Sequence, residues 1–255
     1  MIIYGLNPVL EALRAGRVEA LWVADRRAER ARQIQDEARR QGVAVQTLDD
    51  DGLRRLARGG VHQGVVARSR ALPTTTLDAL TDAGHGPPLL VVLDGVEDPH
   101  NVGAIIRSLH AAGGAGLIRQ TRHAAPLEGA AAKASAGAVY HLPVADVVNI
   151  ARALDELKAA GVWTLGLDAA AETHYDEIDL TLPTAIVVGA EGSGLRRLVR
   201  ERCDRLAAIP MRGQLGSLNV SVATAVVLFE AVRQRNRGRH GREPGRLDSG
   251  GGSVS

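Results

Sequence analysis

The stretch LLVVLDGVEDPHNVGAIIR, residues 89–107, joins an apolar run to a polar loop and then to a run of small and apolar residues. Its five leading aliphatic residues do not alternate with polar ones, which is typical of a strand covered on both faces in a parallel sheet. Pro99 and Asn101 are residue types that mark the start of a helix, and Gly103 lies within that helix. The stretch therefore predicts a strand, a loop and a helix, the repeating unit of an α/β fold.

Outward from this stretch the same pattern recurs. Further apolar runs at residues 116–118, 163–167, 185–188 and 206–209 predict four more buried strands, and with 89–93 they form one parallel sheet.

Two later segments also join a predicted strand to a loop. They are VGAEG at residues 188–192, and IPM at 209–211 running into SLNVS at 217–221. Open α/β sheets bind ligands at the carboxyl ends of their strands, so we expect these two loops and the 94–107 segment to form one split site.

The composition limits the possible functions. The single cysteine, Cys203, excludes an internal disulfide and a CxxC motif, and the histidines have no metal-ligand spacing, so we expect metal-independent chemistry. No apolar run reaches the roughly 18 to 20 residues of a membrane span, and the amino terminus lacks a signal-peptide pattern, so we expect a cytoplasmic protein. The sequence pI near 9.0 is compatible with a polyanionic partner, whereas an aromatic content of 2% argues against base stacking on Phe and Tyr.

The first seventy residues predict a separate small α/β domain. Asn7 is expected to cap a helix that has Pro8 in its first turn and that Gly16 closes, and a charged amphipathic helix is expected over 28–40. Strands are predicted at 20–24, 43–47 and 64–67. We place the domains at 1–70 and 89–235, joined by a linker at 71–88 that contains a short helix at 77–80, and we expect a disordered Arg/Gly-rich tail at 236–255.

The first motif contains two candidate site residues. Asn101 stands where a helix cap would stand, so a purely structural cap is the alternative to a functional role. Arg107 lies among small and apolar residues, where a guanidinium would be costly without an anion, and a phosphate of an RNA substrate would be its natural partner.

In the second motif, residues 189–194 fit neither the dinucleotide-binding fingerprint nor a P-loop. The carboxylate of Glu191 would repel phosphate and suits a cationic or polyhydroxyl ligand, although a simple strand-to-helix turn is the alternative.

The third motif leads into a helix. Ser217 is expected to cap it, and Asn219 is expected two residues inside it. Ser217, Ser221 and Thr224 share a helix face, which is also explained by hydrogen bonds back to helix carbonyls. Residues 220–229 are apolar nearly all round, so we expect this helix to be deeply buried or to lie at a subunit interface.

These three motifs closely resemble those of the SpoU (TrmH-type) family of RNA ribose 2′-O-methyltransferases over residues 88–235. The segments 4–9 and 60–64 extend the resemblance to the members that methylate a guanosine in the peptidyl-transferase loop of 23S rRNA. The resemblance implies a SPOUT-type α/β domain with a C-terminal trefoil knot, preceded by a small L30e-like RNA-binding domain. It also implies a homodimer that uses S-adenosyl-L-methionine.

Carried over by position, the resemblance implies a catalytic group of Asn101, Arg107, Glu191, Ser217 and Asn219. It further implies backbone contacts to the cofactor from Gly189, Ile209 and Leu218. Three alternatives stay open: the same chemistry on transfer RNA or another rRNA site, a noncatalytic RNA-binding or ribosome-assembly protein, and a dinucleotide-dependent oxidoreductase. The last is disfavoured by the missing fingerprint and by Glu191.

Overall fold

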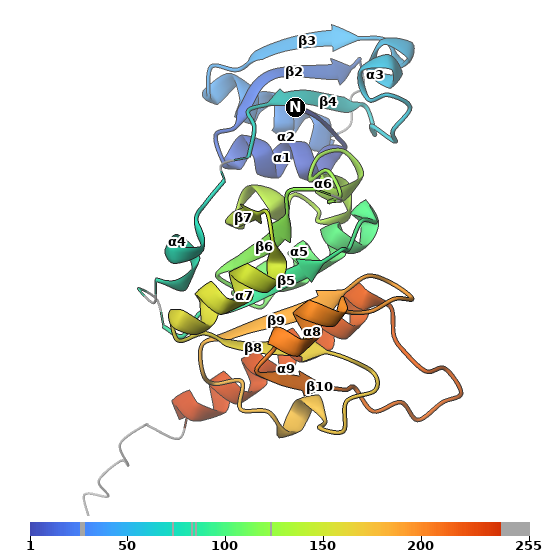
Figure 1. Cartoon of the computed structure of the whole chain (residues 1–255). Coiled ribbons are helices and arrows are strands. Elements are labelled where there is room, and N and C mark those ends of the chain that lie inside the picture. The colour runs from blue at the N-terminus through green and yellow to red at the C-terminus, as the bar shows by residue number, and fades with distance from the viewer. Residues whose placement is uncertain (26–28, 73, 83, 85, 123, 241–255) are drawn as a thin grey trace, which may run out of the picture.

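Two β-sheets, one in each half of the chain, organise the protein (Figure 1). The computed structural model describes residues 1–25, 29–72, 74–82, 84, 86–122 and 124–240. None of the helices in this part of the chain combines the length and the apolar character that a membrane crossing requires.

The first sheet has the strand order β1-β4-β2-β3. Its elements are β1 Ile2–Tyr4, α1 Leu6–Arg14, β2 Val18–Ala24, α2 Glu29–Arg40, β3 Ala44–Leu48, α3 Asp50–Leu56 and β4 Val65–Ser69. Only β2 and β3 are parallel, and β4 pairs antiparallel with both β1 and β2. Leu21 and Val23 of β2 pack with residues of α1 and α2, while Leu53 of α3 packs in a separate cluster with Val66. Helices therefore cover both faces of this sheet.

The expected cap of the first helix is wrong. Helix α1 begins at Leu6, so Asn7 lies inside its first turn and Gly5 is the capping residue, without a side-chain hydrogen bond. The side-chain oxygen of Gln63 accepts the N–H of Leu6 at 3.1 Å. Gln63, far along the chain, thus satisfies the N–H of Leu6, which a local capping side chain would otherwise satisfy.

The segment between the two sheets packs on the second one. Helix α4, Leu77–Thr81, is capped by the Thr76 hydroxyl, which accepts the N–H of Ala79 at 3.3 Å. Leu80 is 3% exposed and joins a cluster that contains residues of the larger sheet. The short helix expected here is confirmed, and it is anchored by an apolar side chain.

The larger sheet has the order β10-β8-β9-β5-β6-β7, and every neighbouring pair of its strands is parallel. Its strands are β5 Leu89–Asp94, β6 Gly116–Gln120, β7 Val144–Val147, β8 Trp163–Leu167, β9 Thr184–Gly189 and β10 Arg205–Ala207. The predicted parallel sheet is confirmed. β7 was not among the predicted strands, because four residues with Asp146 at the third position do not form a distinct apolar run.

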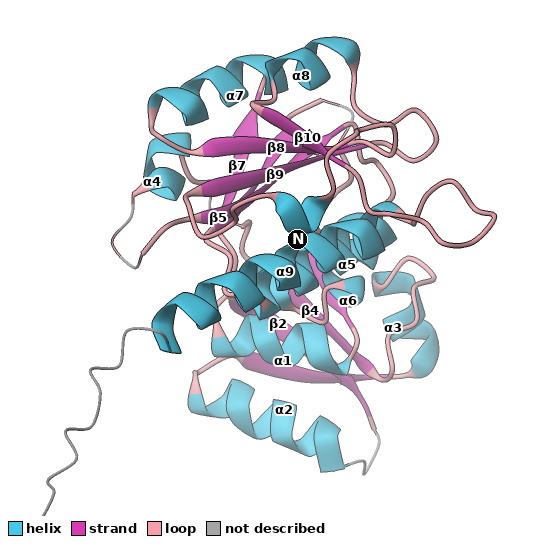
Figure 2. Ribbon diagram, turned by 90° about the horizontal axis from the view of Figure 1, so that it is seen from below, coloured by secondary structure: helices cyan, strands magenta, loops and turns pink. Residues whose placement is uncertain are grey.

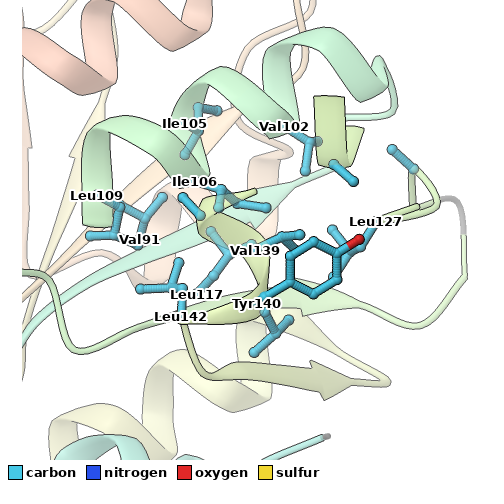
Figure 3. Packing of buried hydrophobic residues seen from close by; sticks show 14 of the residues in the cluster. Val91, Val102, Ile105, Ile106, Leu109, Leu117, Leu127, Val139, Tyr140 and Leu142 are labelled. Carbon is cyan, nitrogen blue, oxygen red and sulfur yellow. The ribbon is translucent and has the colours of Figure 1, made fainter. Parts of the chain in front are cut away.

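Helices cover both faces of this sheet (Figure 2). Its helices are α5 Pro99–Ala111, α6 Ala130–Ala134, α7 Ile150–Ala159, α8 Arg197–Arg202 and α9 Val220–His240. Alternate residues of β5 face opposite ways: Val91 packs with α5 and α9, whereas Leu90 and Val92 pack with α4, α7 and α8. Figure 3 shows the first of these clusters, in which Ile105, Ile106 and Leu109 of α5 lie over the sheet. All six residues of β5 and of β9 are buried, which explains their continuous apolar sequence.

The two halves of the chain are in direct contact. The ring nitrogen Nε2 of His141 lies 2.9 Å from a carboxylate oxygen of Glu11 in α1, and the Nζ of Lys133 donates to the carbonyl of Val61 at 3.3 Å. One apolar cluster also contains residues of both halves, among them Leu13 and Tyr140. The first sheet is thereby held on the α5, α6 side of the second one.

Helix α9 is less buried than its sequence predicts. Val227, Leu228 and Ala231 are fully buried, but Val222 and Phe229 are each 49% exposed. The expectation of deep burial on all sides is therefore wrong for this chain by itself, because only one face of the helix packs on α5 and β9. The helix continues to His240, so residues 236–240 are helical where a disordered tail was expected, and the rest of that tail, 241–255, lies outside the described residues.

Helices α5 and α6 pack closely because residue 103 is glycine. A Cβ added to Gly103 would lie 2.5 Å from the carbonyl oxygen of Ala131 and 2.6 Å from the Cβ of Ala134. Gly103→Ala should lower the free energy of unfolding by up to about 2 kcal/mol, because overpacking of about 1–3 kcal/mol exceeds the roughly 1 kcal/mol gained from the helix propensity of alanine. Urea denaturation would measure this change.

Gly213→Ala is the matched control, since nothing lies within 4 Å of a Cβ built at Gly213. An unchanged or raised stability of Gly103→Ala would show that the α5–α6 contact relaxes freely.

Candidate active site

The three sequence motifs meet at one edge of the larger sheet. They follow β5, β9 and β10, and β8 lies between β9 and β10 in the sheet. Because all these strands are parallel, the loops after them leave from the same edge, and those after β8, β9 and β10 line a cavity of about 750 Å³. Residues after β8, the 189–195 loop, the 209–219 segment and the first turn of α9 line this cavity.

The amide of Asn219 connects the three motifs. Its Nδ2 donates to Oδ1 of Asn101 at 2.9 Å and to Oε1 of Glu191 at 2.6 Å. Its Oδ1 accepts the backbone N–H of Ser221 at 2.9 Å. The amide therefore has one consistent orientation, with both of its N–H groups donating and its oxygen accepting.

Asn219 also begins helix α9. The helix starts at Val220, and Asn219 Oδ1 accepts the N–H groups of Ser221 and Val222 while its carbonyl accepts that of Ala223. The expectation that Ser217 caps this helix and that Asn219 lies inside it is wrong. Two capping residue types stand two positions apart, and the 209–219 backbone decides which one reaches the first turn.

In the first motif the cap of α5 is Asp98, whose carboxylate accepts the N–H of His100 at 3.1 Å. Asn101 is thus in the first helical turn, where it is 7% exposed and points its side chain to Asn219. The alternative that Asn101 is only a helix cap is therefore wrong.

Arg107 does not join this cluster. Six residues along a helix correspond to about 9 Å of rise and 240° of rotation, so Arg107 leaves α5 in a different direction from Asn101. Its side chain is exposed and forms no hydrogen bond or ion pair with any other residue in the part of the chain that the structure describes. The prediction that the Arg107 guanidinium would be costly without an anion is therefore wrong, because the side chain is exposed. The guanidinium remains available to a phosphate.

In the second motif, Gly189 is the point of closest approach. A Cβ added there would lie 2.1 Å from the carbonyl carbon of Gly194 and 2.3 Å from the nitrogen of Leu195. The loop folds back at this point, with the N–H of Gly194 donating to the carbonyl of Ala190 at 2.9 Å. Only glycine allows the end of β9 and the returning loop to come this close, and this brings Glu191 to Asn219.

Six of the eight predicted site residues line the cavity. They are Gly189, Glu191, Ile209, Ser217, Leu218 and Asn219. Asn101 reaches this group through its hydrogen bond with Asn219, and Arg107 neither lines the cavity nor contacts the group. Ser217 is exposed and precedes helix α9. It is not part of the hydrogen bonds that link Asn219 to Asn101 and Glu191.

An ion pair with a buried carboxylate, which no sequence motif indicated, lies at the end of β5. The side chain of Asp94, at the end of β5, is fully buried and pairs with the guanidinium of Arg196. Its second oxygen accepts the backbone N–H of Arg196 at 2.8 Å, and Arg196 also donates to Gln120 at 2.9 Å. The sequence signal that could have indicated this pair is Asp94 itself, because a carboxylate at the end of an apolar, buried strand needs a partner.

A second pair, which no sequence motif indicated either, lies on the cavity wall. Nε of Arg200 donates to Oδ2 of Asp168 at 2.5 Å, and the N–H of Ala170 donates to Oδ1 at 2.9 Å. The Arg200 hydrogen bond and then that of Ala170 hold the pKa of Asp168 below its ordinary value. Asp168 follows β8, a strand whose loop contained no recognised motif.

The side chains that the structure describes provide neither a metal-binding group nor a reactive thiol. Among the residues that the structure describes, no three His, Cys, Asp or Glu side chains are grouped so that they could hold a metal ion. Burial, followed by the charge of Asp204, raises the pKa of the Cys203 thiol to about 12, and the thiol donates to the carbonyl of Val199. A thiol with this pKa is protonated at neutral pH and is a poor nucleophile.

Comparison with known proteins identifies the family. Residues 88–229, which contain all three motifs and the cavity, match the model of the SpoU rRNA Methylase family. The chain belongs to the SpoU rRNA methylase family. Residues 2–75 match a second model, described as RNA 2′-O ribose methyltransferase substrate binding. The family resemblance inferred from the motifs is confirmed.

Several SpoU relatives match nearly the whole chain. The 23S rRNA (guanosine-2′-O-)-methyltransferase RlmB of Ralstonia nicotianae is 44% identical, over 92% of this chain and 96% of its own. RlmB of Vibrio cholerae is 44% identical over 93% and 98% of the two chains. The putative TrmH family tRNA/rRNA methyltransferase YacO of Bacillus subtilis is 40% identical over 92% and 96%.

Solved SpoU structures share the fold. AviRb from Streptomyces viridochromogenes, determined with AdoMet, aligns with a TM-score of 0.80 and 29% identity, over 93% of this chain and 91% of its own. The AdoMet-bound rRNA methyltransferase of Sinorhizobium meliloti gives 0.73 and 29%, over 91% and 86%. The A. aeolicus TrmH/SpoU tRNA modifying enzyme gives 0.55 and 30%, and covers 64% of this chain and 82% of its own.

The Asp94 pair should stabilise this SpoU fold substantially. Asp94→Ala removes a buried acceptor of one backbone N–H and one guanidinium, so the free energy of unfolding should fall by about 2–3 kcal/mol. Chemical denaturation followed by circular dichroism would measure it.

Glu201→Ala is the control, because Glu201 pairs with Arg197 of the same helix on the surface at 2.7 Å. That variant should change stability by less than about 1 kcal/mol. Equal effects of the two substitutions would contradict a special role for the buried carboxylate.

Proposed function

We propose that this protein transfers a methyl group from S-adenosyl-L-methionine to the 2′-hydroxyl of a guanosine in 23S rRNA, in the peptidyl-transferase loop. The observation that carries the proposal is the Asn219 amide, which joins Asn101 and Glu191 beside a cavity of about 750 Å³. The RlmB relatives, which are 43–45% identical to this chain, are 23S rRNA (guanosine-2′-O-)-methyltransferases and support this substrate.

The cavity suits S-adenosyl-L-methionine in size and in chemistry. Its volume falls within the roughly 300–1,000 Å³ of small-molecule sites. Apolar side chains such as Ile209 and Leu218 line it, and Glu191 places a carboxylate where a cationic ligand would bind. Gly189, Ile209 and Leu218 would hold the cofactor mainly through their backbone, and the cofactor would supply an activated methyl group on its sulfonium.

The residues of the chain would position the ribose. Asn101 and Asn219 are held in fixed orientations by their shared hydrogen bond, so they can orient the ribose and the nearby backbone without reorganising. Glu191 keeps the Asn219 amide in place, and Ser217 would contribute from the cavity rim. Alignment of the hydroxyl with the methyl group can supply up to roughly 7–11 kcal/mol of the acceleration.

Arg107 would clamp a phosphate of the RNA outside the cavity, because it does not line the cavity. A guanidinium stays protonated in proteins, so it acts as a charge and a donor and not as a base. Arg107 is exposed on α5 and has no partner among the described residues, which is compatible with a partner that the substrate supplies.

The domain organisation follows from the same proposal. Residues 1–70 would form an L30e-like RNA-binding domain, 71–88 a linker, and 89–235 a SPOUT-type domain whose C-terminal stretch forms a trefoil knot. The half-exposed Val222 and Phe229 of α9 would be covered in a homodimer. An enzyme of ribosomal RNA would work in the cytoplasm.

Transfer RNA is the alternative substrate. The tRNA modifying enzyme of A. aeolicus aligns with only 64% of this chain, whereas the rRNA methyltransferase of Sinorhizobium meliloti aligns with 91%. The family match of residues 2–75 to a substrate-binding model favours a substrate that needs the front domain. A noncatalytic RNA-binding protein would have no need for the Asn101, Glu191 and Asn219 network.

The decisive experiment is methyl transfer from radiolabelled S-adenosyl-L-methionine to 23S rRNA and to bulk transfer RNA, followed by mapping of 2′-O-methylation. We expect label at one guanosine of 23S rRNA, and none with Asn101→Ala. Label only in transfer RNA would show that transfer RNA, and not 23S rRNA, is the substrate. Absence of both label and cofactor binding would favour a noncatalytic RNA-binding protein.

The two roles of Asn219 can be separated. Asn219→Ser keeps a capping oxygen but leaves Oδ1 of the buried Asn101 without its amide donor, so the free energy of unfolding should fall by about 1 kcal/mol. A hydroxyl has one proton and cannot donate to both Asn101 and Glu191, so methyl transfer should fall by about 100-fold. Asn219→Ala, the comparison variant, also loses the cap and should be less stable than Asn219→Ser by about 1 kcal/mol. Full activity of Asn219→Ser would show that the Asn219 amide is not required for methyl transfer.

The clamp role of Arg107 is tested by Arg107→Lys. An ammonium keeps the charge but loses the bidentate geometry, so kcat/KM should fall by roughly 100-fold or more. Arg152→Lys, on the exposed face of α7, is the control and should leave turnover unchanged. Near wild-type turnover of Arg107→Lys would rule out the clamp.

A further inference from the structure

The Asp168–Arg200 pair is a charged part of the cavity wall outside the Asn219 cluster, which consists of Asn101, Glu191 and Asn219. Both residues line the cavity, and the Asp168 side chain is 20% exposed while that of Arg200 is 47% exposed. The backbone of Asp168 is fixed on both sides, since its N–H donates to the carbonyl of Ala207 at 3.1 Å and its carbonyl accepts the N–H of Ala171 at 3.1 Å. The carboxylate is therefore held in place before any ligand binds.

The strand order separates the Asp168–Arg200 pair from the Asn219 cluster. Glu191 follows β9 and Asn101 follows β5, whereas Asp168 follows β8, on the other side of β9 from β5. Neighbouring strands lie about 4.8 Å apart, so the Asp168 backbone leaves the sheet about one strand spacing beyond β9 and two beyond β5. A ligand that reaches both regions must span the cavity.

The carboxylate retains capacity for further donors. An ionised carboxylate accepts about four hydrogen bonds, and those of Asp168 from Arg200 and Ala170 account for two. Its lowered pKa keeps it ionised, and thus an acceptor only, at neutral pH. The remaining positions can accept from a ligand that presents hydroxyl or amino groups.

The charge of the pair selects among those groups. Arg200 offsets most of the negative charge of Asp168, so the site has little attraction for an ammonium group, and Asp168 repels a carboxylate. Neutral donors fit best, and two adjacent hydroxyl groups match a carboxylate with two accepting oxygens. An acidic residue after a strand of an α/β sheet binds ribose hydroxyls in dinucleotide enzymes by the same chemistry.

We propose that Asp168 accepts hydrogen bonds from the ribose hydroxyls of the cofactor's adenosyl group, and that Arg200 is a positioning residue that holds the Asp168 carboxylate. This inference rests on the proposed function, because it assumes that the cavity binds an S-adenosyl compound. It assigns the β8 loop, which has no recognised motif, to selecting a ribonucleoside.

Calorimetric binding of S-adenosylhomocysteine and of its 2′-deoxy and 3′-deoxy analogues tests the inference without any methyl transfer. Wild-type protein should bind at least one deoxy analogue about 10- to 100-fold more weakly than S-adenosylhomocysteine. Asp168→Asn should bind S-adenosylhomocysteine about 10- to 100-fold more weakly than wild type, and it should no longer distinguish that analogue. Arg200→Gln should weaken the binding of S-adenosylhomocysteine more than it weakens the binding of that deoxy analogue.

Asp155→Asn is the matched control, since Asp155 also pairs with an arginine of α8, Arg202, but does not line the cavity. It should bind all three compounds as wild type does. Equal wild-type affinity for the three compounds would overturn the inference even if Asp168→Asn failed to fold, and so would full discrimination by a folded Asp168→Asn. Failure of wild-type protein to bind S-adenosylhomocysteine at all would instead overturn the proposed function.

Discussion

All strands of the larger sheet run in the same direction, and both faces of its central strands are buried, so the polar groups of those strands are accessible only at their ends. Each strand reaches the same edge, where the chain must turn and where its last polar groups need partners. The loops after β5, β8, β9 and β10 meet there because the sheet leaves them no other place. The cavity, the Asn219 cluster and both aspartate–arginine pairs all depend on this constraint.

Polar pairing across distant segments holds that edge together. Asp94 and Arg196 are 102 positions apart in sequence, and Asn219 and Asn101 are 118 apart. A buried carboxylate or amide without a partner is costly, so each of these contacts favours one arrangement of loops over others. Gly189 contributes by the opposite means, since the absence of a side chain lets the returning loop lie against β9. The site is preorganised by contacts that also stabilise the fold.

Several residues have both a structural and a chemical role, and this limits what local rules can say. Asn219 caps α9 with its oxygen and connects Asn101 and Glu191 with its nitrogen. Capping preference fits Ser217 and Asn219 equally well, and it assigned the cap to the wrong one. Asp98 and Asn101 present the same ambiguity at the start of α5, where Asp98 is the cap.

The sequence by itself determined the parallel sheet, the positions of β5, β8 and β9, and the set of loops that forms the site, because continuous apolar runs and glycine-marked turns are local properties. The motif resemblance named Asn101, Glu191 and Asn219, which the structure brings into hydrogen-bond contact. Only the tertiary structure decided that Arg107 is exposed, that α9 buries one face, and that Asp94 and Asp168 have arginine partners. Those outcomes depend on strand order and on the rotation of each helix against the sheet, and no local pattern in the chain specifies either.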